Sequence, residues 1–437
     1  MKESIKKRIE AVRRGEVPEG YSAERAMLFP NDWGEPVALN TVLSENKDRN
    51  EDLRFGKEDV LSVSGEQGVV NQITLLGRSY AGESVAPYHI VEIGDVVYTK
   101  SPLKEKPYGI IKQNRGTAGI VSTLYAVYHC STPITGQYLE NYFCIDTYLN
   151  NYLKPLVKRG AKNDMKVNNE EVLLGRIPLP SLQEQERINE IIAQFDRMID
   201  LKRQLVDENK KTKRIFLRRL FPMQGKNVPE LRFPGFEGEW RKCLLGELSD
   251  FITKGATPTT YGYQWEASGI PFFRNDSIQE NRFVYGEYSF ISETAHTALS
   301  RSEVKADDIL IAITGDIGKV GIVPKEVLRG NINQHMARVR IIKDALPFFV
   351  YQYLSTDTMQ NTYQVIKTGI SMPQLSLEQI RNTEILLPSL EEQQRIASCL
   401  MNLDEAIELH LQELEEVQRK KIALMQLLLT GLVRVNA

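Results

Sequence analysis

The chain has 437 residues, of which 42% are hydrophobic and 26% are charged. Because a single hydrophobic core rarely grows past about 250 to 300 residues, we expect at least two domains. The formal net charge of -2 excludes the strong basic excess that is typical of a protein binding nucleic acid without help from a partner.

The sequence shows no feature of an exported or membrane-anchored protein. Residues 1–14 are charged and helix-like, without the apolar stretch of a signal peptide. The apolar run IALMQLLLTGLV near the C-terminus is shorter than the about 20 residues that a spanning helix needs. The four cysteines occur singly, so the sequence predicts neither a disulfide framework nor a CxxC metal site. We therefore expect a cytoplasmic protein that does not bind membranes.

Residues 1–180 form the first predicted globule, which begins with a helical segment. Gly and Pro separate short alternating apolar runs, a pattern typical of small strands joined by loops. The stretch IPLPSLQEQERI, residues 177–188, closes this globule. Ser181 and Glu184 have the spacing of a capping box, in which the serine accepts from a first-turn amide and the glutamate reaches back to the serine amide. This stretch therefore predicts the start of a helix.

Residues 181–221 keep heptad spacing, which predicts a long helix that packs along its apolar seam against another helix. Residues 222–388 form the second predicted globule, and residues 389–432 repeat the long helix. The stretch ILLPSLEEQQRI, residues 385–396, matches the first copy at nine of twelve positions. The predicted seam residues are Ile188, Ile192, Phe195, Ile199, Val206, Ile396, Leu400, Leu403, Ile407 and Leu414.

The repeat at an offset of 208 residues predicts an α+β protein with pseudo-two-fold symmetry. Two mixed α/β globules would be separated by two long antiparallel helices that form a coiled coil. Polar residues interrupt the seam at Lys202 and His410, and again at Lys213 and Lys421. They would either fix the register of the helices or extend their charges into solvent.

At this point the residues resemble a known family, the specificity (S) subunits of type I restriction-modification systems. The duplicated pattern LPxLxEQxxI before a long helix is similar to the conserved helical regions of that family. In the second globule, KGATPTTYGYQWEASGIPFFRNDSI, AITGDIGKVGIV and GNINQHM resemble a target-recognition domain. The first globule departs from the usual opening of such domains and has KPYGIIKQNRGTAGIVS instead.

The resemblance implies a non-catalytic subunit that reads double-stranded DNA. Each target-recognition globule would read one half of a bipartite site, and the helices would set the gap between the halves. Two methyltransferase (M) subunits and motor-nuclease restriction (R) subunits would supply adenine methylation and ATP-dependent cleavage. S-adenosylmethionine, ATP and Mg would then be bound by the partners, with no cofactor in this chain. Because the two globules differ, the two half-sites would be unlike.

Sequence motifs for catalysis are absent, which agrees with that implication. There is no NPPF or DPPY loop of an amine methyltransferase and no GxxxxGK[ST] phosphate loop. The five histidines lie far apart without metal-ligand spacing. We therefore expect that the chain is not an enzyme, and the interpretation as a stand-alone methyltransferase is disfavoured.

Loops rich in Arg, Lys, Asn and Gln are the candidates for DNA contact, since these side chains pair with base edges and phosphates. For each residue alone, a solvated loop or a local turn is an equally good interpretation. In the second globule the candidates are Lys254, Thr257, Thr259, Tyr261, Arg274, Asn275, Asp276, Lys319, Asn333 and Gln334. In the first globule they are Lys100, Ser101, Lys112, Gln113, Asn114 and Arg115.

Two further interpretations stay open at this stage. A basic cluster on the first long helix, between residues 202 and 219, would cover the phosphates of the unread gap or face solvent or a partner. The whole chain would alternatively be a coiled-coil adapter that joins protein partners without reading DNA. That alternative explains the heptads and the near-zero charge, but not two diverged globules with polar, Gly-flanked loops.

Overall fold

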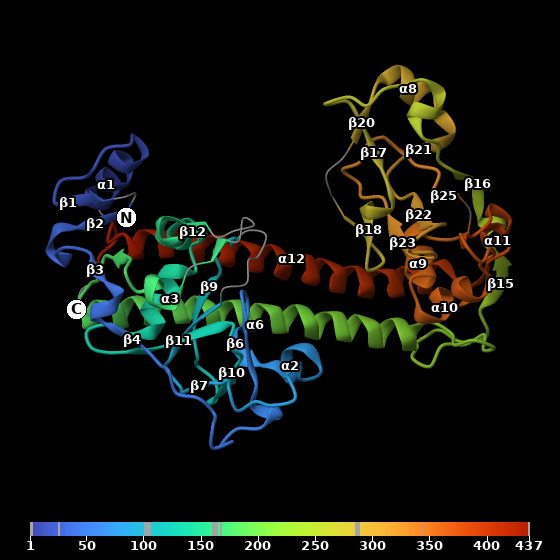
Figure 1. The fold of residues 1–437 in the computed structure, drawn as a ribbon. Coiled ribbons are helices and arrows are strands. Elements are labelled where there is room, and N and C mark those ends of the chain that lie inside the picture. Colours follow the sequence, from blue (N-terminus) through green and yellow to red (C-terminus); the bar gives the residue numbers. More distant parts are fainter. Residues whose placement is uncertain are drawn as a thin grey trace. The chain divides into compact units, whose positions relative to one another are not determined.

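The computed structural model describes residues 3–24, 27–99, 106–159, 165–166, 168–284, 289–342 and 344–435. The chain divides into two compact units, Met1–Lys202 with Glu413–Ala437, and Arg203–Gln412. Figure 1 shows that each unit holds one globule and part of each of the two long helices, α6 (Leu182–Leu220) and α12 (Leu390–Leu429). The predicted ranges are 181–221 and 389–432, and the helices of the structure span residues 182–220 and 390–429.

The first unit is built around a four-stranded antiparallel sheet in the order β4-β11-β8-β9. The central strand β8 is buried at every residue, which suits its β-branched and aromatic sequence VVYT. Its elements before α6 are α1 (Glu3–Arg13), β1 (Tyr21–Glu24), β2 (Met27–Pro30), β3 (Val37–Ala38), β4 (Leu43–Glu45), β5 (Leu61–Ser64), β6 (Gly68–Asn71), α2 (Gln72–Leu76), β7 (His89–Val91), β8 (Val96–Thr99), β9 (Ile110–Gln113), β10 (Gly119–Val121), β11 (Tyr125–Cys130), α3 (Gly136–Phe143), α4 (Asp146–Leu153), β12 (Lys158–Arg159), β13 (Met165–Lys166), α5 (Asn169–Val172) and β14 (Arg176–Ile177).

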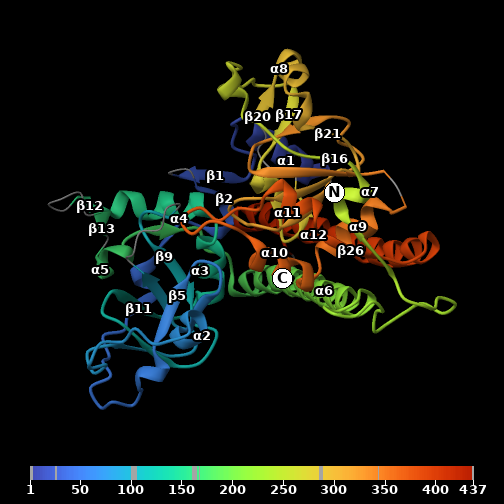
Figure 2. The same cartoon turned by 90° about the vertical axis from the view of Figure 1, so that its right-hand side faces the viewer.

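The second unit repeats this arrangement, with an antiparallel sheet in the order β16-β25-β22-β23. A second sheet, β20-β17-β24-β21, carries α8 at one end in both views (Figures 1 and 2). Its elements between α6 and α12 are β15 (Arg241–Leu244), α7 (Leu245–Leu248), β16 (Ser249–Lys254), β17 (Ile270–Phe273), β18 (Ile278–Gln279), β19 (Arg282–Phe283), β20 (Ser289–Ile291), α8 (Glu293–Ala298), β21 (Glu303–Val304), β22 (Ile309–Ala312), β23 (Val320–Ile322), β24 (Gly330–Ile332), β25 (Met336–Ile341), α9 (Pro347–Leu354), α10 (Asp357–Ile366), α11 (Leu377–Arg381) and β26 (Glu384–Leu387).

The two sheets correspond strand by strand, which is the repeat that the sequence predicts. A buried aspartate stands just before the central strand in each: Asp95 before β8 and Asp308 before β22. Each carboxylate closes its turn by accepting a backbone N–H at 2.8 Å, from Glu92 and Lys305 respectively. The same local chemistry therefore starts the central strand of both globules.

Within the first unit, the first part of α6 packs antiparallel on the last part of α12. Ile188 and Ile192 are buried in one core with Met425, Leu428 and Leu429. Polar contacts flank this core, since Lys202 Nζ lies 2.6 Å from the Glu413 carboxylate and Lys421 pairs with Asp196. Lys202 and Lys421, two of the predicted interruptions of the seam, are thus ion-paired across it.

Within the second unit, the last part of α6 packs on the first part of α12 in the same way. Leu220 shares a core with Ile396 and Leu400, and Leu403 packs against it. Lys213 Nζ lies 2.7 Å from the Asp404 carboxylate. This pair and Asp196–Lys421 are equivalent, because each residue lies 208 positions from its counterpart. Of the other seam residues, Ile199, Val206 and Ile407 are buried, while Phe195 and Leu414 are half-buried.

Candidate nucleic-acid interface

The repeated motif that opens each long helix joins the helix to its globule. The Ser181 hydroxyl accepts from the Glu184 amide at 3.3 Å, and Ser389 does the same for Glu392. Gln185 donates to the carbonyl of Pro180 and accepts from the Thr135 amide just before α3. Gln393 makes the equivalent contacts to Pro388 and to Leu346 before α9.

The prediction that each glutamate of the capping box bonds to the serine amide is wrong, because each carboxylate binds an arginine instead. The Glu184 carboxylate binds the Arg434 guanidinium through two contacts of 2.7 and 2.8 Å, and accepts from Trp33 Nε1 at 2.9 Å. Glu392 binds Arg232 in the same two-pronged way at 2.7 and 2.8 Å. A guanidinium satisfies both oxygens of a buried carboxylate, so it replaces the serine amide as the partner.

The same arginine ties the end of the chain to its beginning within the first unit. Arg434 Nη1 contacts both oxygens of Asp32 at 2.8 Å, and the Tyr21 hydroxyl donates to the Gly431 carbonyl at 2.6 Å. The hydrogen bonds that Arg434 donates to Glu184 and Asp32 raise its pKa. Arg434 thus binds Glu184 in the first unit as Arg232 binds Glu392 in the second.

A continuous hydrogen-bond network, here called the Thr314 network, gathers several predicted DNA-binding residues of the second globule. Thr257 donates to Gln334 Oε1, and Gln334 Nε2 lies 2.9 Å from His335 Nε2. His335 Nδ1 lies 2.8 Å from Thr314 Oγ1, and the Thr314 carbonyl accepts from Asn275 Nδ2 at 2.7 Å. Because the Gln334 amide is a donor, His335 accepts at Nε2 and donates from Nδ1.

Four separate segments meet in this network. Thr257 precedes the short helix Pro258–Tyr261, Asn275 follows β17, Thr314 follows β22, and Gln334–His335 lie between β24 and β25. Gln334 is exposed, whereas the Asn275 Oδ1 atom is buried without a donor among the described residues. Gly315 has a φ of +69°, a conformation that favours glycine in the turn after Thr314. The ends of strands from both four-stranded sheets of the second unit therefore hold a row of donors and acceptors.

Most of the other candidates of the second globule have exposed side chains. Arg274 lies 4.9 Å from the centre of the Trp265 ring and donates to Ser289 at 2.8 Å. Lys319 is paired with Asp316 at 3.3 Å. Asn333 is buried and accepts from the His335 amide, so it supports the network rather than facing outward. Lys254, Thr259, Tyr261 and Asp276 are exposed.

In the first globule the side chains of the predicted residues Lys112, Gln113 and Asn114 are bonded to other parts of the globule. Lys112 is buried in β9, with its Nζ atom 3.4 Å from Glu140 and 3.3 Å from Cys144 Sγ. Burial opposes its charged form, but these two neighbours outweigh burial and raise the pKa of Lys112. Gln113 donates to the Gly94 carbonyl, and Asn114 to those of Glu92 and Thr117.

Arg115 is the one candidate of this globule, within the described part of the chain, that keeps an exposed side chain. Its guanidinium lies 2.9 Å from Glu140, and 45% of the side chain is exposed. Lys100 and Ser101 lie outside the described residues. Lys112 and Gln113 are predicted as loop residues, whereas in the structure residues 110–113, IIKQ, form strand β9.

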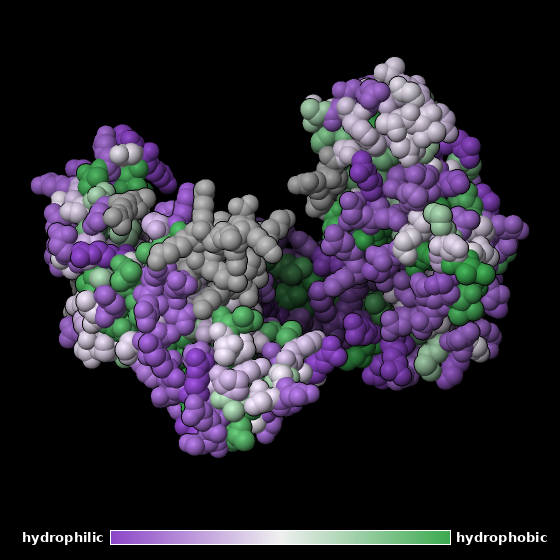
Figure 3. Space-filling view, in the orientation of Figure 1, coloured by the Kyte–Doolittle hydropathy of each residue, from purple (hydrophilic) through white to green (hydrophobic). Residues whose placement is uncertain are grey.

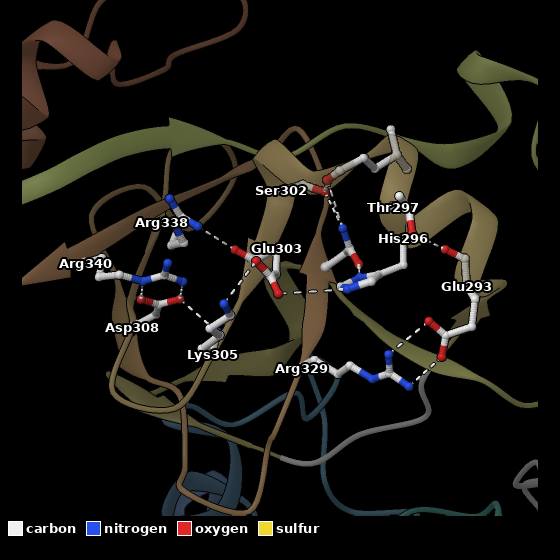
Figure 4. Close-up of polar contacts among 12 residues, drawn as sticks. Glu293, His296, Thr297, Ser302, Glu303, Lys305, Asp308, Arg329, Arg338 and Arg340 are labelled. Carbon is white, nitrogen blue, oxygen red and sulfur yellow. Dashed lines mark hydrogen bonds and ion pairs between the residues drawn. The ribbon is translucent and has the colours of Figure 1, made fainter.

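A second polar cluster of the second unit is structural (Figure 4). The Asp308 carboxylate binds Arg340 through two contacts of 2.7 Å, and Arg338 donates to the Glu303 carbonyl at 2.7 Å. Burial, together with the nearby Arg340, lowers the pKa of Arg338. His296 contacts Asn331, whose amide donates to Ser302 and to the Leu299 carbonyl. These contacts join α8, β21 and β24 at the start of β22, the opposite end of that strand from Thr314.

The basic cluster on α6 is largely neutralised by carboxylates of its own unit. Lys210 pairs with Glu280 at 2.8 Å, Lys211 with Glu208 at 2.7 Å, and Arg219 with Glu230 at 2.9 Å. On the face shown in Figure 3, hydrophilic and hydrophobic side chains are interspersed over both units. Among the residues that the structure describes, no group of His, Cys, Asp and Glu is arranged to hold a metal ion. Within the same residues, no helix is long and apolar enough to span a membrane.

Comparisons with known proteins identify the family. Residues 52–210 and 237–419 match the family model of the type I restriction modification DNA specificity domain. The chain is 28% identical over 435 residues to the putative type I restriction enzyme MjaX specificity subunit of Methanocaldococcus jannaschii, covering 97% of this chain and 96% of that one.

Solved structures share the fold. A chain from a structural study of complex assembly and conformational transition of the type I R-M system matches with a TM-score of 0.55 and 17% identity, over 96% of this chain and 100% of that chain. The type I restriction-modification S subunit from M. genitalium matches with a TM-score of 0.53 and 13% identity, over 92% and 96%. With the family model covering more than half of the sequence, this chain belongs to the type I restriction-modification DNA specificity family.

Proposed function

We propose that this chain recognises double-stranded DNA at a bipartite, asymmetric site and directs partner subunits to it. The observation that carries the proposal is the Thr314 network, in a chain that belongs to the DNA specificity family. Gln offers a bidentate donor and acceptor pair that suits adenine in the major groove. Thr257 and Asn275, from other segments, would place further hydroxyl and amide groups on bases or phosphates.

Each globule has its own four-stranded sheet with the same strand arrangement, but the loops at the strand ends differ between the two globules. The Thr314 network occupies the strand ends in the second globule, whereas Gln113 and Asn114 in the first are held by backbone carbonyls. Two unlike edges would read two unlike half-sites. The unread bases between them would follow from the length of the paired helices. A coiled-coil adapter without DNA readout is not favoured, because it leaves the family membership unexplained.

Chemistry would come from partners in this proposal. Two methyltransferase subunits would bind S-adenosylmethionine and methylate adenine, and restriction subunits would use ATP and Mg to cleave. The chain itself would be a non-catalytic cytoplasmic component. Because the net charge is -2 and the α6 cluster is ion-paired, we expect weak, salt-sensitive DNA binding by the isolated chain.

Sequencing of modified bases tests the proposal. Cells that carry the methyltransferase subunit would be compared with and without this chain. The expected result is methylation, only with the chain present, at one motif of two unlike halves separated by a fixed number of bases. Methylation that is independent of the chain, or that follows no split motif, would contradict the proposal.

A further inference from the structure

The loop between α10 and α11 exposes two aliphatic side chains at a tight tip. Ile370 is fully exposed and Met372 is 79% exposed. The tip, residues 369–373, is closed by a pair of backbone hydrogen bonds between Thr368 and Gln374, at 2.9 and 2.8 Å. Gly369 has a φ of +95°, and a Cβ atom there would lie 2.6 Å from the Met372 carbonyl oxygen. The turn therefore requires glycine, and its backbone is fixed although its side chains are exposed.

The base of this loop is bonded to the segment that carries the Thr314 network. The Leu375 amide donates to the Ile313 carbonyl at 3.0 Å, and Thr314 forms a backbone bridge with Gln374. From α10, Gln364 donates to the Ile317 carbonyl at 2.7 Å. The base of the loop is thus bonded to the residues that follow β22, including Thr314 of the network.

The composition of the loop indicates what would cover it. Between residues 365 and 375, in the sequence VIKTGISMPQL, there is one lysine and no acidic residue, so the loop itself carries no charge that repels a polyanion. DNA grooves offer polar edges together with apolar surface, namely thymine methyl groups and base faces. Ile and Met are among the side chains that proteins insert against base steps. A duplex would meet the polar network and the apolar tip together.

We propose that Ile370 and Met372 form an apolar fingertip that contacts bases of the half-site read by the second globule. The contact is made with the apolar surface of the bases, either a thymine methyl group or the face of a partly unstacked base. This inference rests on the proposed function and narrows it, since it assigns part of the sequence preference to two side chains that make no hydrogen bond to a base edge.

The test uses the full chain co-expressed with its methyltransferase subunit. Ile370→Ser with Met372→Ser is expected to lower the methylation rate at the target site by about tenfold or more. Leu328→Ser is the matched control, because Leu328 is 84% exposed in the same unit. It lies past Val323, which bonds to Asp307 and Asp308 at the opposite end of β22 from Thr314. The control is expected to methylate at the wild-type rate.

Two arms distinguish the sources of apolar surface. If thymine methyl groups are contacted, uracil in place of thymine in that half-site lowers the rate of the wild type but not of the double variant. If a base step is opened, 2-aminopurine placed there becomes brighter when the wild type binds, and stays dim with the double variant. Either result supports the fingertip.

Three outcomes are separable. A double variant that methylates at the wild-type rate overturns the fingertip. A double variant that no longer copurifies with the methyltransferase subunit also overturns it, because the tip would then bind protein. If the wild-type complex itself methylates no split motif, the proposed function fails rather than the fingertip alone. Melting of the double variant at the wild-type temperature excludes unfolding as the cause of a lost rate.

Discussion

Lys213 Nζ lies 2.7 Å from the carboxylate of Asp404, and both side chains are mostly buried between α6 and α12. Gln352 donates to the other Asp404 oxygen at 2.8 Å. Since the Asp196–Lys421 pair stands 208 positions away in both helices, the repeat places an equivalent ion pair along the seam in each unit. Such a pair favours one register, because a slipped helix would bury a charge without its partner.

Loss of the lysine is expected to destabilise the second unit. Lys213→Met leaves the Asp404 carboxylate without its cation and should cost about 2 to 4 kcal/mol of local unfolding free energy. Adding Asp404→Asn, which keeps an acceptor for Gln352, should recover most of this. Hydrogen exchange of residues 396–410 measures both effects. Lys211→Met is the control, since Lys211 is exposed and should change stability by less than about 0.5 kcal/mol.

Arg434→Ala is expected to loosen the joined ends of the first unit. The substitution leaves the buried Glu184 carboxylate with Trp33 alone and should cost about 2 to 3 kcal/mol. Amides of residues 27–33 and 184–192 should exchange faster with solvent. Arg419→Ala, which removes a side chain that is 70% exposed, serves as the control. Unchanged hydrogen exchange in both segments of the Arg434 variant would show that the contacts of Arg434 with Glu184 and Asp32 contribute nothing to stability.

Gln334→Ala is expected to relax the preference for one base pair in one half-site. A bidentate amide contact gives about 1 to 3 kcal/mol of discrimination, or about five- to 150-fold between bases. Sequencing of modified bases in cells with the variant should show a degenerate position in one half of the motif, with the other half intact. Glu326→Ala, an exposed position past β23, should leave the motif unchanged. A uniform loss across all sequences would instead indicate a phosphate contact.

Asp95 should give the first unit a distinctive pH dependence. Burial raises the pKa of the Asp95 carboxyl, against smaller opposite effects of the Glu92 amide and His129. The folded state therefore holds this proton more tightly than the unfolded chain, in which aspartate titrates near about 3.9. The contribution of Asp95 to the free energy of unfolding then falls as pH rises from about 3.9 through the folded pKa.

Comparison with Asp95→Asn isolates that contribution. The free energy of unfolding of the wild type minus that of the variant should decrease as pH rises through this window. Urea unfolding of both proteins at a series of pH values measures the difference. A difference that increases with pH would mean that the carboxylate form is the one stabilised by folding.

The long helices were predictable because their signals are local and repeated. Heptad spacing and the Ser-x-x-Glu start recur at a fixed offset, and α6 and α12 begin within two residues of Ser181 and Ser389. The partner of Glu184 was not predictable, because Arg434 lies 250 positions away and no local pattern joins the two. Long-range charge pairing therefore overrides a spacing rule that is correct for isolated helices.

The candidate interface was predictable only in part. Thr257, Asn275 and Gln334 do meet, but Thr314 and His335, which connect them, carry no periodic signal. Lys112 was misplaced for the opposite reason, since a lysine between glycines reads as a loop residue until a strand buries it. Ile370 was missed because an exposed aliphatic side chain cannot be told from a core residue in sequence alone.

The duplicated ion pairs limit how the paired helices α6 and α12 can change in length. Extra residues inserted in α6 between Asp196 and Lys213 would carry Lys213 away from Asp404 while Asp196 stays with Lys421. Only an insertion of equal length in α12, between Asp404 and Lys421, keeps both pairs. Since about 3.6 residues make one helical turn, the matched additions must also come in near-whole turns to keep each lysine facing the seam. Lengthening the helix pair during evolution would thus need two coordinated insertions, one in α6 and one in α12.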